Sequence, residues 1–466
     1  MKPKHNRSGR NRSPRPNVSL LERIKIDVAG IDCGASEHYV AVPVDRSPHS
    51  VRSFRTFTAD LHHLVDWLEC CGVRSVAMEA TGVYWIPLFE ILEQRGLEVL
   101  LVNARHVKNV AGRKSDVLDC EWLRELHSVG LLRGSFRPAD AIVVLRGYLR
   151  HRDTLVEAMS SIIQRMQKAM VQMNVRLAEV LADITGVTGM AIMRDIVEGH
   201  TDPAQLVRHR DPRCRASEEE FVTALTGNYR SEHVFALKQN LDLYAHHETM
   251  LQTCDEATEA YLQTLVAQGE GQPSQSTARK RRQPKGHEPI FDVHSYLHGV
   301  TGVDLSQIDG IGPYQALRLI SEIGVDMSRW RTAHHFTAWL TLAPQNKVSG
   351  GRLLSSRTQP SGNRAKAMFR MIAMSLARTQ TALGAFYRRL SGRIGKAKAI
   401  TATARKVAIL VYRMLKKEIT YQDPGPATYT EHQRARALRN LKKRATMLGL
   451  ALVPVDSGAL SIEGVS

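Results

Sequence analysis

Four acidic residues in the first third of the chain have the residue type and the setting that a divalent-cation site requires. Asp32 closes the apolar run VAGID and Glu79 closes SVAME, while Asp116 and Asp119 stand in GRKSDVLDCEW. If the two runs are neighbouring strands, Asp32 and Glu79 project from one edge of a sheet. The spacing of three places Asp116 and Asp119 on one face of a helix. Carboxylates so crowded repel each other unless a cation lies among them, and oxygen ligands suit Mg²⁺ or Mn²⁺. Two such ions would bind the attacking and leaving oxygens of a phosphodiester.

Each acid also has an ordinary structural interpretation. Any one of them could be a strand-end or N-capping residue, and Asp116, which follows Ser115, has the sequence of a normal helix start. The setting favours the metal site, because the acids end apolar strands in a chain whose formal charge is +18.

A second group of candidate residues lies in a strongly basic stretch. Between Met327 and Lys417 the chain has nineteen Lys and Arg residues and no Asp or Glu. A stretch of one sign and this length repels itself unless phosphates neutralise it, so it favours contact with nucleic acid.

Within this stretch, APQNKVSGGRLLSS places Ser349 before Gly350 and Gly351. Glycines let a backbone approach a phosphate closely, and Lys347 and Arg352 would offset the charge that develops on it. A serine in that setting could attack phosphorus directly. The alternative is a plain turn serine, and three other serines compete for the role: Ser355, Ser356 and Ser361.

A glycine turn stands upstream of the basic stretch. In IDGIGPYQALRLISEIG, Gly310, Gly312 and Pro313 precede a helical pattern. The segment resembles a helix-hairpin-helix turn, whose backbone N–H groups hold a DNA phosphate. Alone, a GIG sequence is a weak indication.

Short apolar runs must position the acids. IDVAGID, HYVAVPVD and VRSFRTF predict three adjacent strands, and SVAMEA and LEVLLVNA predict two more with helices between them. This order is typical of an α/β sheet in an RNase H-like domain.

Beyond residue 150 the strands stop and two long amphipathic helices are predicted. They could pair as an antiparallel coiled coil or dimerise with another subunit, and their methionines are expected to be core residues. The first stripe is Leu155, Met159, Ile162, Met166, Met170, Met173 and Leu177. The second stripe is Leu237, Leu241, Tyr244, Leu251, Cys254, Tyr261 and Leu265.

Composition limits the class of protein. Lys and Arg outnumber Asp and Glu by 64 to 46, which suits a polyanionic partner, although ribosomal and membrane-surface proteins share that balance. The six cysteines show no zinc spacing and are expected to be reduced thiols. No run resembles a membrane span or a signal peptide, so a soluble, cytoplasmic and nucleoid-associated protein without a membrane partner is expected.

Six segments together resemble the DEDD-type transposases of the one-ten insertion-sequence family, and within it the eleven-eleven branch. They are GIDCGASEHYVAV, MEATGVYW, LVNARHVKNVAGRKSDVLDCEWL, LLRGSF, IDGIGPYQA and LAPQNKVSGG. The resemblance implies a bacterial transposase in which Asp32, Glu79, Asp116 and Asp119 bind Mg²⁺ and Ser349 forms a covalent phosphoserine bond with DNA. It also implies a noncoding guide (bridge) RNA that pairs with donor and target DNA. Dimers that assemble into tetramers are the implied partner arrangement, with the acids of one subunit meeting the serine of another.

The predicted fold is a multidomain α/β plus α protein: an N-terminal RNase H-like (RuvC-like) domain, a central long-helix coiled coil and a C-terminal, mostly helical domain. The predicted segments are a disordered basic arm (1–24), the RuvC-like domain (25–150), a helical dimerisation region (151–270), a basic flexible linker (271–289), the basic transposase domain (290–424) and a tail (425–466). Two other functions fit the residues as well. One is a hydrolytic RuvC-like endonuclease or resolvase in which Ser349 only binds, and the other is a non-catalytic nucleic-acid-binding protein.

Overall fold

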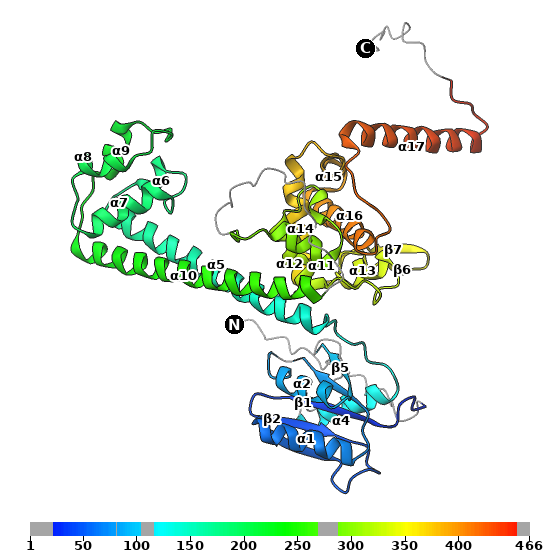
Figure 1. Cartoon of the computed structure of the whole chain (residues 1–466). Helices are drawn as coiled ribbons and strands as arrows, with labels where there is room; N and C mark the ends of the chain where they lie inside the picture. Colours follow the sequence, from blue (N-terminus) through cyan, green and yellow to red (C-terminus); the bar gives the residue numbers. More distant parts are fainter. Residues whose placement is uncertain (1–21, 81, 104–115, 269–287, 454–466) are drawn as a thin grey trace, which may run out of the picture. The chain divides into compact units, whose positions relative to one another are not determined.

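The chain divides into two compact units, Met1–Arg137 and Pro138–Ser466. The structure is a computed structural model that describes residues 22–80, 82–103, 116–268 and 288–453 (Figure 1). The boundary between the two units lies before residue 150, which is the predicted end of the RuvC-like domain. The predicted basic arm, apart from its last three residues, and almost all of the predicted 271–289 linker lie outside the described residues.

The first unit is built on a five-stranded sheet with the strand order β3-β2-β1-β4-β5. Strands β1, β2 and β3 form an antiparallel meander, whereas β4 and β5 run parallel to β1. The predicted sequence of three adjacent strands followed by alternating helices and strands is confirmed, and the RuvC-like assignment stays a prediction. The strands are β1 Val28–Cys33, β2 Glu37–Ala41, β3 Val51–Arg55, β4 Ser75–Glu79 and β5 Glu98–Val102.

Alternation along the strands gives the sheet two apolar faces. Ile31 and Met78 belong to a core with the buried sides of α1 (Thr58–Cys70) and α2 (Ile86–Gln94). Ala77 and Val102 pack instead with Leu123 of α4 (Asp116–Ser128) on the other face. The face toward α4 is the one that carries the candidate acids.

The second unit begins with a long antiparallel helix pair, α5 (Asp140–Gln172) and α10 (Ser231–Gln268). Tyr261 near the end of α10 donates a hydrogen bond to the backbone oxygen of Ala141 near the start of α5, at 2.8 Å. The predicted pairing of the two stripes therefore occurs within one chain. The coiled-coil and dimerisation assignments stay predictions.

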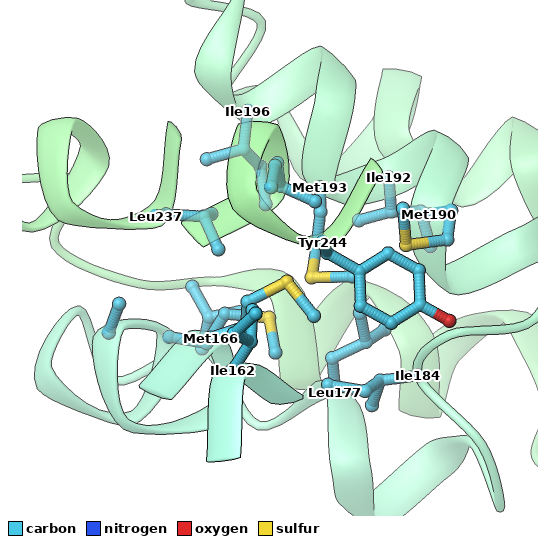
Figure 2. Packing of buried hydrophobic residues seen from close by; sticks show 14 of the residues in the cluster. Ile162, Met166, Leu177, Ile184, Met190, Ile192, Met193, Ile196, Leu237 and Tyr244 are labelled. Atoms are coloured by element: carbon cyan, nitrogen blue, oxygen red, sulfur yellow. The ribbon is translucent and has the colours of Figure 1, made fainter. Parts of the chain in front are cut away.

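Short helices complete a hydrophobic core at the end of the pair where α5 stops and α10 begins (Figure 2). Met166 of α5 and Tyr244 of α10 are buried there, as the two stripes predict, and Met190 and Met193 join them. The added elements are α6 Leu177–Val180, α7 Val187–Val197, α8 Pro203–Leu206, η2 Val207–His209 and α9 Glu218–Leu225.

The rest of the second unit is mostly helical, with one hairpin, and centres on an aromatic cluster. Phe336 lies 5.0 Å from Trp330, 5.7 Å from Tyr412 and 6.4 Å from Phe369, centroid to centroid. The elements are α11 Val293–Thr301, η3 Leu305–Gln307, α12 Pro313–Ile323, α13 Ala333–Trp339, β6 Lys347–Ser349, β7 Arg352–Ser355, α14 Arg364–Ser375, η4 Leu376–Arg378, α15 Ala382–Ile394, α16 Lys396–Leu415 and α17 Gly425–Met447. Helix α17 occupies much of the segment that the sequence analysis treats as a tail.

A buried ion pair joins α5 to α10, and a hydrogen bond from the same arginine reaches α12. Arg152 of α5 is 1% exposed and forms a bidentate pair with Asp255 of α10, with its second contact at 3.0 Å. It also donates a hydrogen bond to the hydroxyl of Tyr314 in α12 at 3.1 Å. Three helices thus share one buried guanidinium.

Within the described part of the chain, no helix combines the length and apolarity needed to cross a membrane.

Candidate active site

The first two acids lie side by side at one edge of the sheet. Strand β1 pairs in parallel with β4, and the register places Ile31 opposite Met78. Asp32 and Glu79 each follow by one residue, so both stand at the carboxyl ends of neighbouring strands and on the same face. Glu79 is only 8% exposed, whereas Asp32 is half-buried.

A glycine allows α4 to approach this face. A Cβ atom at Gly30 would lie 2.2 Å from the carbonyl oxygen of Cys120 and 2.4 Å from the backbone nitrogen of Arg124. Only glycine therefore permits the observed distance between β1 and α4. The contact joins Gly30, which lies two residues before Asp32 on β1, to Cys120, which follows Asp119 in α4. It therefore holds Asp119 near the strand that carries Asp32.

The remaining acids occupy the first turn of α4. Asp116 is exposed and Asp119 half-buried. The charge of Glu37, followed by burial and a hydrogen bond to Glu37, raises the pKa of Tyr39, and the charge of Asp116 adds a smaller effect. Because Tyr39 is the register partner of Asp32 on β2, Asp116 faces the same corner of the sheet.

Neighbouring thiols report the same concentration of negative charge. Burial, followed by the charges of Asp32 and Glu79, raises the pKa of the Cys33 thiol strongly. Burial and the charges of Glu121 and Asp32 raise the pKa of Cys120 to about 12. Both thiols therefore stay protonated at neutral pH in the metal-free protein. The structure thus places carboxylates from β1, β4 and α4 on one face of the sheet.

Ser349 stands at the tip of a β-hairpin in the second unit. Gly350 and Gly351 have φ angles of 53° and 75° and form the two-residue turn between β6 and β7. Positive φ at both positions is typical of a type I′ hairpin turn. The glycines therefore have a conformational role, and Ser349 is exposed immediately before them.

Two basic side chains lie near Ser349 on the hairpin. Arg352 is the register partner of Ser349, and side chains directly opposite on antiparallel strands lie on one face. Lys347 precedes Ser349 by two residues on the same strand and is also exposed, although the register is irregular between Lys347 and Val348. Ser349 therefore has one cation opposite it on β7 and a second two residues before it on β6.

The competing serines have different surroundings. The hydroxyl oxygen of Ser355 accepts a hydrogen bond from the backbone N–H of Arg357 at 3.3 Å, and that of Ser361 accepts one from Asn363 at 3.1 Å. Both are turn-stabilising contacts. Ser356 is exposed and lies beyond the end of β7, farther from the glycine turn.

The glycine turn before α12 has a packing role. Gly310 has a φ of 83°, and a Cβ there would lie 3.0 Å from the hydroxyl oxygen of Ser375 and 3.2 Å from the side chain of Leu376. Gly312 is the N-cap of α12, and Pro313 occupies the first turn. A helix start of this kind also exposes backbone N–H groups, so the predicted phosphate contact stays a prediction.

A cationic pair near the base of the hairpin was not identified from the sequence. Lys366 of α14 donates hydrogen bonds to Gln359, which follows β7, at 3.0 Å and to the hydroxyl of Thr341 at 2.8 Å. Burial and the charge of Arg370 lower the pKa of Lys366. The spacing of four between Lys366 and Arg370 in a helical segment is the sequence pattern that could have identified this pair.

Among the described residues, the group of three whose ligand atoms lie within 4.8 Å of one another is Asp195, Glu198 and His200. The four acids of the first unit, which the structure also describes, share a face but do not come together this closely. Asp195 additionally accepts a hydrogen bond from the ring of His209 at 2.7 Å. Exposed acidic groups of this kind also form without a metal, and we assign the group no function.

Family comparisons cover both candidate sites. A transposase model of the IS110 DEDD type matches residues 29–175, which include all four acids. A second model, described as the transposase IS116/IS110/IS902 family, matches residues 304–388, which include the hairpin with Ser349. The chain carries IS110-family transposase domains.

The two IS110-family matches cover the elements that carry the candidate residues. The DEDD model spans β1, β4 and α4 and extends along α5, whereas the second model spans α12 to α15. Helix α17 and the core around α7 lie outside both matches. No curated protein matches the chain. Transposase domains imply DNA binding and the cleavage and recombination of DNA.

Proposed function

We propose that the chain is a Mg²⁺-dependent, RNA-guided recombinase of an insertion sequence, with Mn²⁺ as an alternative ion. In this proposal Asp32, Glu79, Asp116 and Asp119 bind the ions and Ser349 is the nucleophile. The observation that carries the proposal is the common face of the sheet that presents Asp32 and Glu79 beside the first turn of α4.

The donor set fits a hard divalent cation. All four side chains offer carboxylate oxygens, which are the ligands that Mg²⁺ and Mn²⁺ prefer. Two ions held there would stabilise the attacking and leaving oxygens of a phosphodiester. Asp116 is exposed and Glu79 buried, so a DNA strand would approach from the side of α4's first turn.

Ser349 would conserve bond energy during strand exchange. Its Oγ forms a bond to phosphorus and loses its proton, while the bond from phosphorus to a deoxyribose oxygen breaks and that oxygen leaves as a hydroxyl. Lys347 and Arg352 would hold the phosphate oxygens during this step. Reversal by a different hydroxyl would join the strand to a new partner.

RNA guidance and the assembly of subunits belong to the same proposal. The motifs resemble enzymes in which a bridge RNA pairs with donor and target DNA, and the positive charge of the chain suits two polyanionic partners. The acids and Ser349 belong to different units of the chain. A dimer that assembles into a tetramer would let the acids of one subunit act with the serine of another.

The decisive experiment traps the covalent intermediate. Purified protein is incubated with labelled element-end DNA, copurified RNA and Mg²⁺, and is denatured before electrophoresis. We expect a protein–DNA adduct that Ser349→Ala abolishes and that Ser356→Ala, a matched exposed serine, leaves intact. Asp119→Asn should abolish the adduct while DNA binding is kept.

Other outcomes would favour the rival functions. Cleaved DNA with free 5′-phosphate ends and no adduct would indicate a hydrolytic nuclease. Unchanged function in Asp119→Asn would indicate a non-catalytic binding protein. For RNA guidance, sequencing of the copurified RNA should give one discrete species encoded beside the gene, and a mixture of cellular RNAs would refute the guided mechanism.

A further inference from the structure

Helix α17 (Gly425–Met447) is a long helix without a buried side chain. It contacts the rest of its unit near its start, where Tyr429 accepts a hydrogen bond from the Nε of Arg389 in α15 at 2.8 Å and packs against Phe386. From Arg434 to Met447 every residue except the half-buried Ala445 is exposed. Figure 1 shows α17 as one continuous rod. Helices in proteins gain most of their stability from packing, and the exposed part of α17 packs against nothing in the described chain, so it is available to a partner.

The charge of α17 identifies the chemistry of that partner. The helix carries six Lys or Arg residues and a single acid, Glu431. Among the described residues, none of the six cations forms an ion pair. A partner of high negative charge density would satisfy them together. The cations are Arg434, Arg436, Arg439, Lys442, Lys443 and Arg444.

Cations lie on all sides of the helix, with Arg434 on the side of Leu438 and Leu441, but three of the six form one continuous face. Arg436, Arg439 and Lys443 follow a spacing of three and four and therefore share one face. Leu438 and Leu441 lie on another face, where they are 47% and 51% exposed. The basic face is suited to a phosphate backbone, and the apolar face offers a narrow stripe that a second copy of the chain would use instead.

Dimensions favour duplex DNA over RNA. A helix of 23 residues is about 35 Å long, which is about one turn of B-DNA. Its diameter of about 10–12 Å fits the major groove of B-DNA, which is about 12 Å wide. The major groove of A-form RNA is too narrow for side chains to enter.

We propose that α17 is a DNA-binding arm that lies in the major groove of duplex DNA. The inference rests on the proposed function in assigning DNA as the substrate, and it adds a contact outside both matched family domains. Arg436, Arg439 and Lys443 bind backbone phosphates on this account.

The test uses the full-length protein and a 30-base-pair DNA duplex without Mg²⁺, so binding is measured in the absence of cleavage. Fluorescence anisotropy gives the dissociation constant over a series of salt concentrations. The variant is Arg436→Gln/Arg439→Gln/Lys443→Gln. Its matched control is Arg208→Gln/Arg215→Gln/Lys238→Gln. This control removes three exposed cations from the surface around the α6–α9 helices, where α5 ends and α10 begins.

We expect the α17 variant to reduce the slope of log affinity against log salt by about 0.9 for each phosphate that no longer meets a cation, or nearly 3 in total. The control should keep the wild-type slope. An A-form RNA duplex of the same sequence should show a smaller reduction. Equal slopes for variant and wild-type protein on DNA, or an equal reduction on RNA, would overturn the proposal.

A second variant distinguishes a protein partner. Leu438→Ala/Leu441→Ala should leave the mass measured by sedimentation and the DNA-binding slope unchanged. A shift to a smaller oligomer in this variant would indicate that α17 joins two copies of the chain, and would refute the DNA-binding arm. Because binding is measured without catalysis, absence of the Ser349 adduct would refute the proposed chemistry while leaving this result interpretable.

Discussion

Gly30→Ala tests whether the close approach of α4 to β1 positions the acidic cluster. The new Cβ would lie 2.2 Å from the carbonyl oxygen of Cys120, whereas ordinary van der Waals contact begins at 3.4 Å. Helix α4 must therefore retreat by about 1.2 Å at this point. Asp119 precedes Cys120, so it would move away from Asp32 by a similar distance. Misplacement of about 1 Å reduces catalysis by about 100-fold, and overpacking destabilises a core by about 1–3 kcal/mol.

Three measurements on Gly30→Ala separate these effects. Formation of the protein–DNA adduct under Mg²⁺ should fall by about 100-fold. Binding of Mn²⁺, followed by electron paramagnetic resonance, should weaken, and the midpoint of urea unfolding should fall. Gly147→Ala is the matched control, because a Cβ at that helical position meets no atom within 4 Å. It should be neutral or stabilising by about 0.5–1 kcal/mol.

The reasoning about Gly30 would be refuted by one result in particular. If Gly30→Ala keeps wild-type Mn²⁺ affinity and wild-type adduct formation, the distance between β1 and α4 does not determine the site. A folded Gly30→Ser protein carries the same Cβ atom and should show the same order of defects, and normal Mn²⁺ affinity in it would contradict the argument equally.

Three further predictions concern stability and the hairpin. Arg152→Ala leaves Asp255 buried without its partner and should lower the free energy of unfolding by about 3–5 kcal/mol in urea titration. Arg152→Met/Asp255→Leu should recover most of that loss; an equal decrease in both variants would show that the unpaired charge of Asp255 is not its cause. Burial lowers the pKa of His127 to about 4. Between that pH and about 6.5, the unfolded chain binds a proton at His127 that the native chain does not bind. The free energy of unfolding should therefore fall as the pH decreases from about 6.5 to about 4, by about 3 kcal/mol in all. His127→Gln should flatten that profile, and an unchanged profile would exclude His127 as its cause. Gly351→Val places a β-branched residue at a φ of 75° and should reduce adduct formation at Ser349 without changing the melting temperature by more than a few degrees; full activity would show that turn geometry is unimportant.

The sheet and the positions of the acids could be predicted because their sequence signals are local. Apolar runs ending in Asp32 and Glu79 indicate strands, and a spacing of three indicates that Asp116 and Asp119 share a helical face. The three-strand meander followed by alternating helices and strands is confirmed by the register of β1 with β2 and β4.

Features that depend on contacts between distant segments could not be predicted in this way. Nothing near Gly30 in the sequence indicates that Cys120 and Arg124 pack against it, because ninety residues separate the two segments. The sequence suggests that Gly350 and Gly351 allow a close approach to phosphate, whereas the structure shows that their positive φ angles form the hairpin turn. The segment of α17 resembles a tail in sequence because exposed basic residues dominate it and its apolar stripe is narrow.

The antiparallel pair of α5 and α10 also constrains how members of such a group can differ in length. A helix of 33 residues spans about 50 Å, and each added residue extends it by about 1.5 Å and turns its end by about 100°. Matched insertions of seven residues would carry the methionine-rich end outward by about 10 Å with a rotation of only about 20°, whereas five residues would rotate it by about 140°. The length of the helix pair can therefore change only in steps of about seven residues if the orientation of its methionine-rich end is to be preserved.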